Sequence, residues 1–166
     1  MIIRTLAGTG VVLLALTGCG GNDDAQAKEA ISKELQSNKI GDFSLTKKDA
    51  DCIANGMVDK VGVDQLQKYG LLTKDNKTDK SPDEVKMSDK DAQASAEVFV
   101  GCIDAGKMIT DAMGSSMPAE VTDCIDKALT DDVLTKLFAS MFRGEDAQQV
   151  SQELLAQPLT ECMTGG

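Results

Sequence analysis

The most reactive side chains in this 166-residue chain are its five cysteines, and the first of them, Cys19, stands in a distinctive context. It follows Leu16-Thr17-Gly18 at the end of an apolar stretch. A Leu at −3, small residues at −2 and −1 and Cys at +1 make up a lipobox. In a lipobox the Cys thiol receives a diacylglyceryl group, and a peptidase that needs small side chains then cuts before the cysteine. We therefore expect Cys19 to be acylated, carrying palmitate or a similar chain, and to become the mature N-terminus.

The segment before Cys19 has the organisation of a secretory signal peptide, which we assign to residues 1–18. Arg4 supplies the only charged side chain of a short first part, and residues 6–16 form an apolar part too short for a permanent membrane span. The alternatives are an ordinary signal peptide, or an uncleaved anchor, with an incidental cysteine. The polar, glycine-containing residues 20–24 resemble a tether and favour the lipoprotein. We expect the protein on the extracytoplasmic face of the cell membrane.

The other four cysteines form an even set in a chain predicted to be exported: Cys52, Cys102, Cys124 and Cys162. An even number of cysteines in such a chain indicates two disulfides, with three possible connectivities. A metal site is the competing interpretation, but the chain has no histidine and no Cys-x-x-Cys pair. We expect structural disulfides, no metal and no cofactor.

The charge of the chain limits its partners. Residues 19–166 carry 16 basic and 27 acidic side chains, a formal net charge of −11. So acidic a chain repels phosphate backbones, which makes nucleic acid an unexpected partner. It also gains no overall attraction from anionic lipid, so attachment must come from the acyl chains.

The sequence offers little for catalysis. Histidine, the commonest general base, is absent, and so are a Gly-x-Ser-x-Gly elbow and a glycine-rich phosphate loop. The acidic pair Asp131-Asp132 lies near an expected helix N-terminus, where the helix dipole favours negative charge. Residues 75–86 resemble a calcium loop, but Lys80 and Lys86 replace the required glycine and glutamate. We therefore expect no enzymatic activity.

The elements that position the cysteines are all expected to be helices, because no stretch alternates apolar and polar residues long enough for a strand. Residues 24–35 predict a weakly amphipathic stalk helix, within a lipidated tether at 19–45. Capping boxes at Thr46/Asp49 and Ser88/Asp91 open two helices of the domain at 46–166, and the second is expected to run to Gly114. Between them residues 74–86 predict an exposed polar loop.

Three further helices are expected in the second half of the chain. One starts at Pro118, one is capped by Thr130 and carries the clearest apolar stripe, and one starts at Asp146 and is interrupted at Pro158. The expected fold is an all-α, disulfide-stapled helical bundle.

An internal repeat relates the two halves. Asp51-Cys52-Ile53 recurs as Asp123-Cys124-Ile125, and Asp91-Ala92-Gln93 recurs as Asp146-Ala147-Gln148, each followed by a second cysteine. The spacing between the two motifs is 17 residues longer in the first copy, about the length of the polar loop. The repeat therefore predicts two related helical units, at about 46–114 and 117–164. The alternative explanation of the repeat is chance similarity between amphipathic helices. Duplication would favour the pairs Cys52–Cys102 and Cys124–Cys162.

These motifs, with Val100-Gly101-Cys102-Ile103-Asp104, resemble an uncharacterised group of exported actinobacterial proteins. The resemblance spans about residues 46–163 and rests on cysteine spacing and short apolar patterns. Members of that group have two half-repeats, four cysteines and no established activity. The resemblance implies the fold and export, and it supplies no active site.

Two functions remain as hypotheses. The first is a non-catalytic binding module that contacts an envelope protein or wall component through a surface around Met108, Met113 and Met117. The second is a small carrier that encloses an apolar ligand or lipid near those methionines and Phe99, Phe138 and Phe142. Core packing is the alternative role for the methionines. A filled core favours the binding module. A cavity of roughly several hundred Å³, the size of known ligand pockets, favours the carrier.

Overall fold

The computed structural model describes residues 21–37, 44–80, 84–108 and 118–164. They form seven named helices: α1 (Gly21–Ser37), α2 (Lys47–Lys60), α3 (Val63–Tyr69), α4 (Asp89–Cys102), α6 (Ala119–Ala128), α7 (Asp131–Phe142) and α8 (Ala147–Thr164). In these ranges β-pairing is limited to an isolated bridge between Leu72 and Thr78. The predicted all-α fold is confirmed. The lipobox with Cys19, and also Met113 and Met117, lie outside the described residues.

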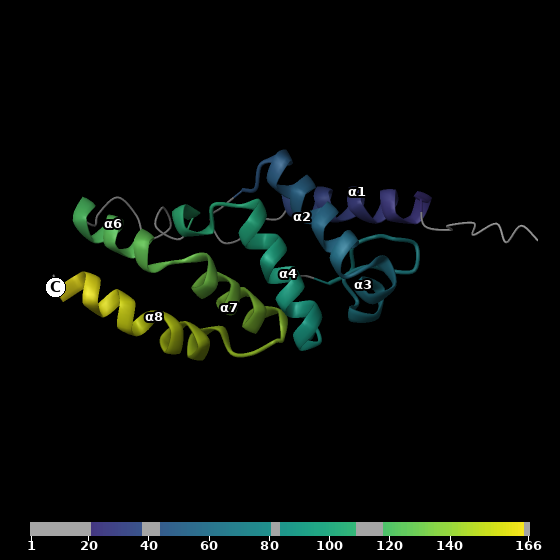
Figure 1. Cartoon of the computed structure of the whole chain (residues 1–166). Coiled ribbons are helices and arrows are strands. Elements are labelled where there is room, and N and C mark those ends of the chain that lie inside the picture. The colour runs from purple at the N-terminus through teal and green to yellow at the C-terminus, as the bar shows by residue number, and fades with distance from the viewer. Residues whose placement is uncertain (1–20, 38–43, 81–83, 109–117, 165–166) are drawn as a thin grey trace, which may run out of the picture.

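The molecule is elongated (Figure 1). The start of α1 and helix α3 lie at one end, and α6 and the C-terminal end of α8 lie at the other, with α4 and α7 between them. None of the helices in the described part is long and apolar enough to cross a membrane.

Both disulfides predicted from the repeat are present. Cys52 pairs with Cys102 and joins α2 to α4, and Cys124 pairs with Cys162 and joins α6 to α8. The repeated isoleucines next to the first cysteines, Ile53 and Ile125, are both fully buried. The repeat is incomplete beyond this point, because α2 continues to Lys60 whereas α6 ends at Ala128.

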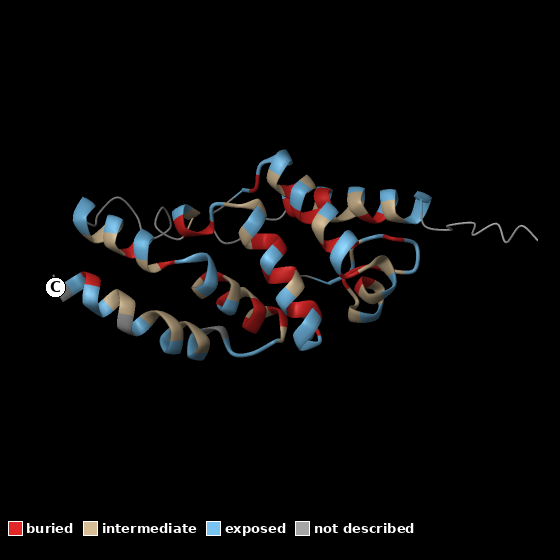
Figure 2. Ribbon diagram, viewed as in Figure 1, coloured by how far each residue is buried: buried red, intermediate tan, exposed pale blue. Residues whose placement is uncertain are grey.

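Two apolar clusters form the core, and they meet at α4 and α7. The larger cluster is built from α1–α4, the segment between α3 and α4, and the C-terminal half of α7. The smaller one joins α6, α8 and the start of α7. Ile103 and Phe138 pack against both clusters. Figure 2 shows the buried residues concentrated along α4 and the adjoining part of α7, whereas α8 is mostly half-buried or exposed.

Local capping signals define several boundaries. The Thr46/Asp49 capping box is present with both of its hydrogen bonds. Gly70 ends α3 in the left-handed conformation, at φ 81°. The box predicted at Ser88 is only half formed, because the Ser88 N–H donates to the Tyr69 hydroxyl and not to Asp91.

The prediction of a stalk at the N-terminus is wrong. α1 already includes the residues expected to be a flexible tether from Gly21 onward, and it packs lengthwise against α2. Ala27 is fully buried and Leu35 is 9% exposed, because their spacing places both on the face turned toward the domain. The burial of this stripe makes α1 part of the domain core.

Three other expectations need correction. α4 ends at Cys102, since Ile103 is extended and Asp104 caps a new helical turn at 105–108 through the Lys107 N–H. α8 continues through Pro158 without interruption. The described residues of the segment 74–86 are not all exposed, because Asn76 and Val85 are 6% and 2% exposed.

Candidate functional site

The cysteines predicted as site residues are structural staples. Cys52 is exposed and Cys102 half-buried, whereas Cys124 is half-buried and Cys162 is buried. All four are bonded in pairs, which leaves no free thiol among them.

Of the three methionines proposed as a contact surface, the structure places only Met108. Its side chain is half-buried and packs against the larger apolar cluster. This position favours a packing role for Met108. Met113 and Met117 lie outside the described residues, so the proposed surface as a whole stays untested.

The three phenylalanines of the carrier hypothesis pack on one another. The ring centroids of Phe99 and Phe138 are 5.9 Å apart, and those of Phe99 and Phe142 are 5.3 Å apart. Both separations are typical of aromatic rings in contact. The space at which a carrier would hold its ligand between these rings is therefore filled by the rings themselves.

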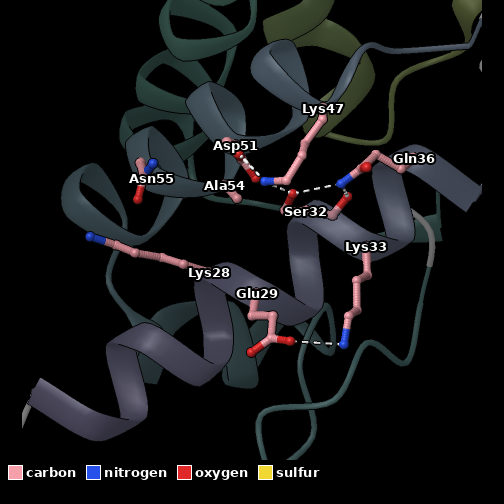
Figure 3. Close-up of a pocket in the computed structure, with 9 residues that line it drawn as sticks. All are labelled: Lys28, Glu29, Ser32, Lys33, Gln36, Lys47, Asp51, Ala54 and Asn55. Carbon is pink, nitrogen blue, oxygen red and sulfur yellow. Dashed lines mark hydrogen bonds and ion pairs between the residues drawn. The ribbon is translucent and has the colours of Figure 1, made fainter.

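A polar groove that the sequence did not predict lies between α1 and α2 (Figure 3). It has a volume of about 450 Å³ and is lined by residues that recur at helical spacing on the two facing helices: Lys28, Glu29, Ser32, Lys33, Gln36, Lys47, Asp51, Ala54 and Asn55. The signal was present in the spacing of 28/32/36 and 47/51/55, but it has meaning only once α1 is known to pack on α2. Because α1 was expected to be a free stalk, there was no reason from the sequence to expect a groove with α1 as one of its walls.

The floor of the groove is a connected hydrogen-bond network. The buried Ser32 hydroxyl donates to Asp51 Oδ1 at 2.6 Å and accepts from the Gln36 amide at 2.9 Å. Lys47 Nζ lies 2.5 Å from Asp51 Oδ2. The Lys47 ammonium, followed by the Ser32 hydroxyl, lowers the pKa of the Asp51 carboxyl. The lowered pKa keeps Asp51 ionised.

The rim is more loosely held. Lys33 forms an i,i+4 pair with Glu29 at 2.8 Å, with both side chains about 70% exposed, and this contact lowers the pKa of Glu29. Lys47 is 75% exposed, and Lys28 reaches Asp59 at 2.7 Å. Exposed ion pairs contribute little net stability, so these ammonium and carboxylate groups can exchange partners readily.

The chemistry of the groove is that of hydrogen bonding and charge pairing. Ser32 donates its proton to a carboxylate that Lys47 already holds ionised, and no histidine exists to activate the hydroxyl. In the described part of the chain no group of three potential metal-ligating side chains comes together. What the groove offers is a set of alternating positive and negative groups beside amide and hydroxyl groups.

A second polar cluster surrounds Asp91 at the start of α4. The Tyr69 hydroxyl donates to Asp91 Oδ2 at 2.6 Å, Ser88 Oγ lies 3.1 Å from the same oxygen and the Gln65 amide 3.4 Å from it. The Tyr69 hydrogen bond is the main cause of a lowered Asp91 pKa. Asp91 is only 8% exposed. The hydrogen bonds of the cluster join α3 to the start of α4, so we assign it to the fold.

Comparison with family models, with curated proteins and with solved structures finds no match. The resemblance to exported actinobacterial four-cysteine proteins therefore stays a prediction.

Proposed function

We propose that this chain is a lipid-anchored extracytoplasmic binding module whose ligand surface is the groove between α1 and α2. The observation that carries the proposal is that the helix directly after the lipobox packs into the domain and forms a polar groove with α2. An inert spacer would need no such packing.

The groove favours a short ligand with both charge signs. Lys33 and Lys47 on the open edge suit a carboxylate, and Glu29 and Asp51 suit an ammonium group. From Lys28 to Gln36 the wall of α1 extends about 12 Å, at 1.5 Å per residue. Three to four residues of extended peptide, at roughly 3.3 Å each, match that length. We infer that the ligand is a short zwitterionic peptide or a peptide segment of the cell envelope.

The carrier hypothesis has less support. It needs an apolar cavity in the core, and the mutual packing of Phe99 with Phe138 and Phe142 argues against one at that place. A catalytic role has no observation in its favour.

The anchor is tested with the Cys19→Ser variant. Acylation predicts that the unaltered chain incorporates labelled palmitate and sediments with membranes, and that the variant loses the label and becomes soluble. A variant that keeps the label would contradict lipidation at Cys19.

The groove is tested with a tetrapeptide, Ala-Glu-Lys-Ala with free termini, added to the isotopically labelled protein in detergent. We expect amide shift changes in NMR spectra around Ser32 and Asp51, and much weaker changes in a Lys33→Gln, Lys47→Gln double variant. Lys136→Gln is the matched control, because Lys136 forms the same i,i+4 pair with Asp132 on α7, away from the groove. Equal binding by the double variant, or equal shifts with an uncharged, end-capped tetra-alanine, would contradict the proposed ligand class.

A further inference from the structure

The predicted anchor and the folded domain are almost contiguous. α1 begins at Gly21, so Gly20 alone separates it from Cys19. Two residues span at most about 7 Å. α1 is held to the domain by the burial of Ala27 and by the Lys28–Asp59 and Ser32–Asp51 contacts. Acyl chains on Cys19 would therefore hold the first turn of α1, and whatever lies beside it, at the bilayer surface.

The segment beside that first turn is the loop at 71–80, which we call the anchor-side loop. The Asn76 amide donates to the Asp23 carbonyl oxygen in this turn at 3.4 Å. Farther along α1, toward its C-terminal end, the Thr78 hydroxyl lies 2.9 Å from Glu34 Oε2. Asn76 has a positive φ of 54° and is buried, so the tip of the loop is turned in against α1. In Figure 1 this loop and the start of α1 lie at the same end of the molecule, opposite α6 and the C-terminus.

The loop has a defined conformation of its own. Thr73 N–H donates to the Lys77 carbonyl at 2.7 Å, Asp79 N–H donates to the Leu71 carbonyl at 3.2 Å, and Leu72 is 2% exposed. The loop therefore presents its outward-facing side chains from a fixed backbone. Three of those side chains are lysines, all of them exposed: Lys74, Lys77 and Lys80.

The anchor-side loop differs in charge from the rest of the chain. Its three lysines stand against Asp75 and Asp79, a net charge of +1, with Asp23 and Asp24 of α1 beside it. The remainder of residues 19–166 carries −12. A nearly neutral surface with lysines on flexible stems meets anionic headgroups with far less repulsion than any strongly acidic surface, and lysine amines reach phosphate oxygens readily.

We propose that the anchor-side loop rests on the lipid headgroups, with Lys74 and Lys77 contacting lipid phosphates. The inference rests on the proposed lipidation of Cys19. It gives the module a fixed orientation, in which the α6–α8 end is the part farthest from the bilayer.

The test uses tryptophan fluorescence, because the chain contains no tryptophan. A single Trp is introduced into the full lipidated protein by Lys77→Trp or, with all lysines kept, by Asp75→Trp. Gln149→Trp at an exposed site of α8 is the control. The proteins are inserted into phosphatidylcholine–phosphatidylglycerol vesicles that contain a lipid spin-labelled on its headgroup. We expect severalfold stronger quenching at 75 and 77 than at 149.

The outcomes separate the two proposals. Equal quenching at all three positions in a protein that floats with the vesicles overturns the orientation and leaves the anchor intact. A wild-type protein that neither carries acyl chains nor floats overturns both proposals. Quenching of the tryptophan at position 77 that persists when Cys19→Ser is added would show that the acyl anchor is not what holds the loop at the membrane. Native disulfide pairing in each variant, checked by peptide mapping, confirms that the Trp reports on the folded loop.

Discussion

At Gly56 the backbone of α2 lies against Val98 of α4. A Cβ on Gly56 would stand 2.5 Å from Val98 Cγ1, well inside van der Waals contact. One turn away on the same two helices, Cys52 and Cys102 are bonded with a Cα–Cα distance of 5.7 Å. Gly56 thus permits the close helix approach that the disulfide needs.

Gly56→Ala is expected to destabilise the domain. Alanine gains about 1 kcal/mol of helix propensity over glycine, but overpacking against Val98 costs about 1–3 kcal/mol. Gly101→Ala on α4 is the matched control, since its added Cβ would have nothing within 4 Å, and it is expected to stabilise slightly. Urea unfolding measures both variants. A Gly56→Ala protein as stable as the Gly101→Ala protein would contradict the close approach.

Asp91 makes the stability of the fold pH-dependent. Its pKa is lowered in the folded state, mainly by the Tyr69 hydroxyl. Ionised Asp91 therefore stabilises the fold above its unfolded pKa of about 3.9. This contribution is lost as the pH falls from about 4 through the folded-state pKa.

Asp91→Asn is expected to lower the free energy of unfolding at pH 7 by about 1–3 kcal/mol, because a charge-assisted hydrogen bond is lost in a buried place. The variant should also lose less stability than the wild type as the pH falls from about 5 to about 2, the range in which carboxylates become protonated. Urea unfolding across pH checks this. Parallel pH profiles for the two proteins would show that Asp91 does not carry the effect.

At the scale of elements, features fixed by near neighbours were predictable from the sequence. The Thr46 capping box, the left-handed Gly70 and the Thr130 cap depend on residues within one turn. The disulfide pairing was also predictable, because the duplicated Asp-Cys-Ile motif pairs each cysteine within its own unit.

Features decided by distant contacts were not predictable in this way. The Ser88 box changes because Tyr69, 19 residues away, takes the Ser88 N–H. α4 ends early where Ile103 turns between two apolar clusters. The groove was missed because the weak stripe of Ala27, Ile31 and Leu35 does not reveal its partner. A weakly apolar helix face is compatible with a free stalk and with a helix at the edge of a core. Only the presence of a helix packed against that face distinguishes the two.

Leu35→Ala tests whether α1 belongs to the core. Leu35 is 9% exposed in the larger cluster, so its truncation is expected to cost about 2–4 kcal/mol. Lys33→Ala, at an exposed position on the same helix, should change stability by less than about 0.5 kcal/mol. Thermal unfolding compares the two. A Leu35→Ala protein that melts with the wild type would restore the stalk interpretation.

At the scale of the whole molecule, the two units, each closed by its own disulfide, share one hydrophobic core. The contact between α4 and α7 is the most extensive among the named helices, and Phe138 packs against both apolar clusters. Each unit thus lacks part of its core without the other. We expect a single unfolding transition.

Phe138→Ala tests this coupling. It is expected to lower the stability by about 3 kcal/mol, the lower end for a Phe truncation because the ring is half-buried. Native-state hydrogen exchange should show amide protection falling by similar factors in α2 and α6. A loss confined to α6 would mean that the units unfold independently. Leu159→Ala, which removes a half-buried side chain packed on the smaller cluster alone, is the comparison.

The order of the two disulfides along the chain has a consequence for biosynthesis. The loop closed by Cys52 and Cys102 ends before the loop closed by Cys124 and Cys162 begins, so the two neither overlap nor interlock. In a chain that crosses a membrane N-terminus first, Cys52 and Cys102 emerge while the other two thiols are still behind them. Their correct partners are then also their first available partners. If the chain is exported as proposed, sequential oxidation during translocation would yield the native pairing without a later isomerisation step.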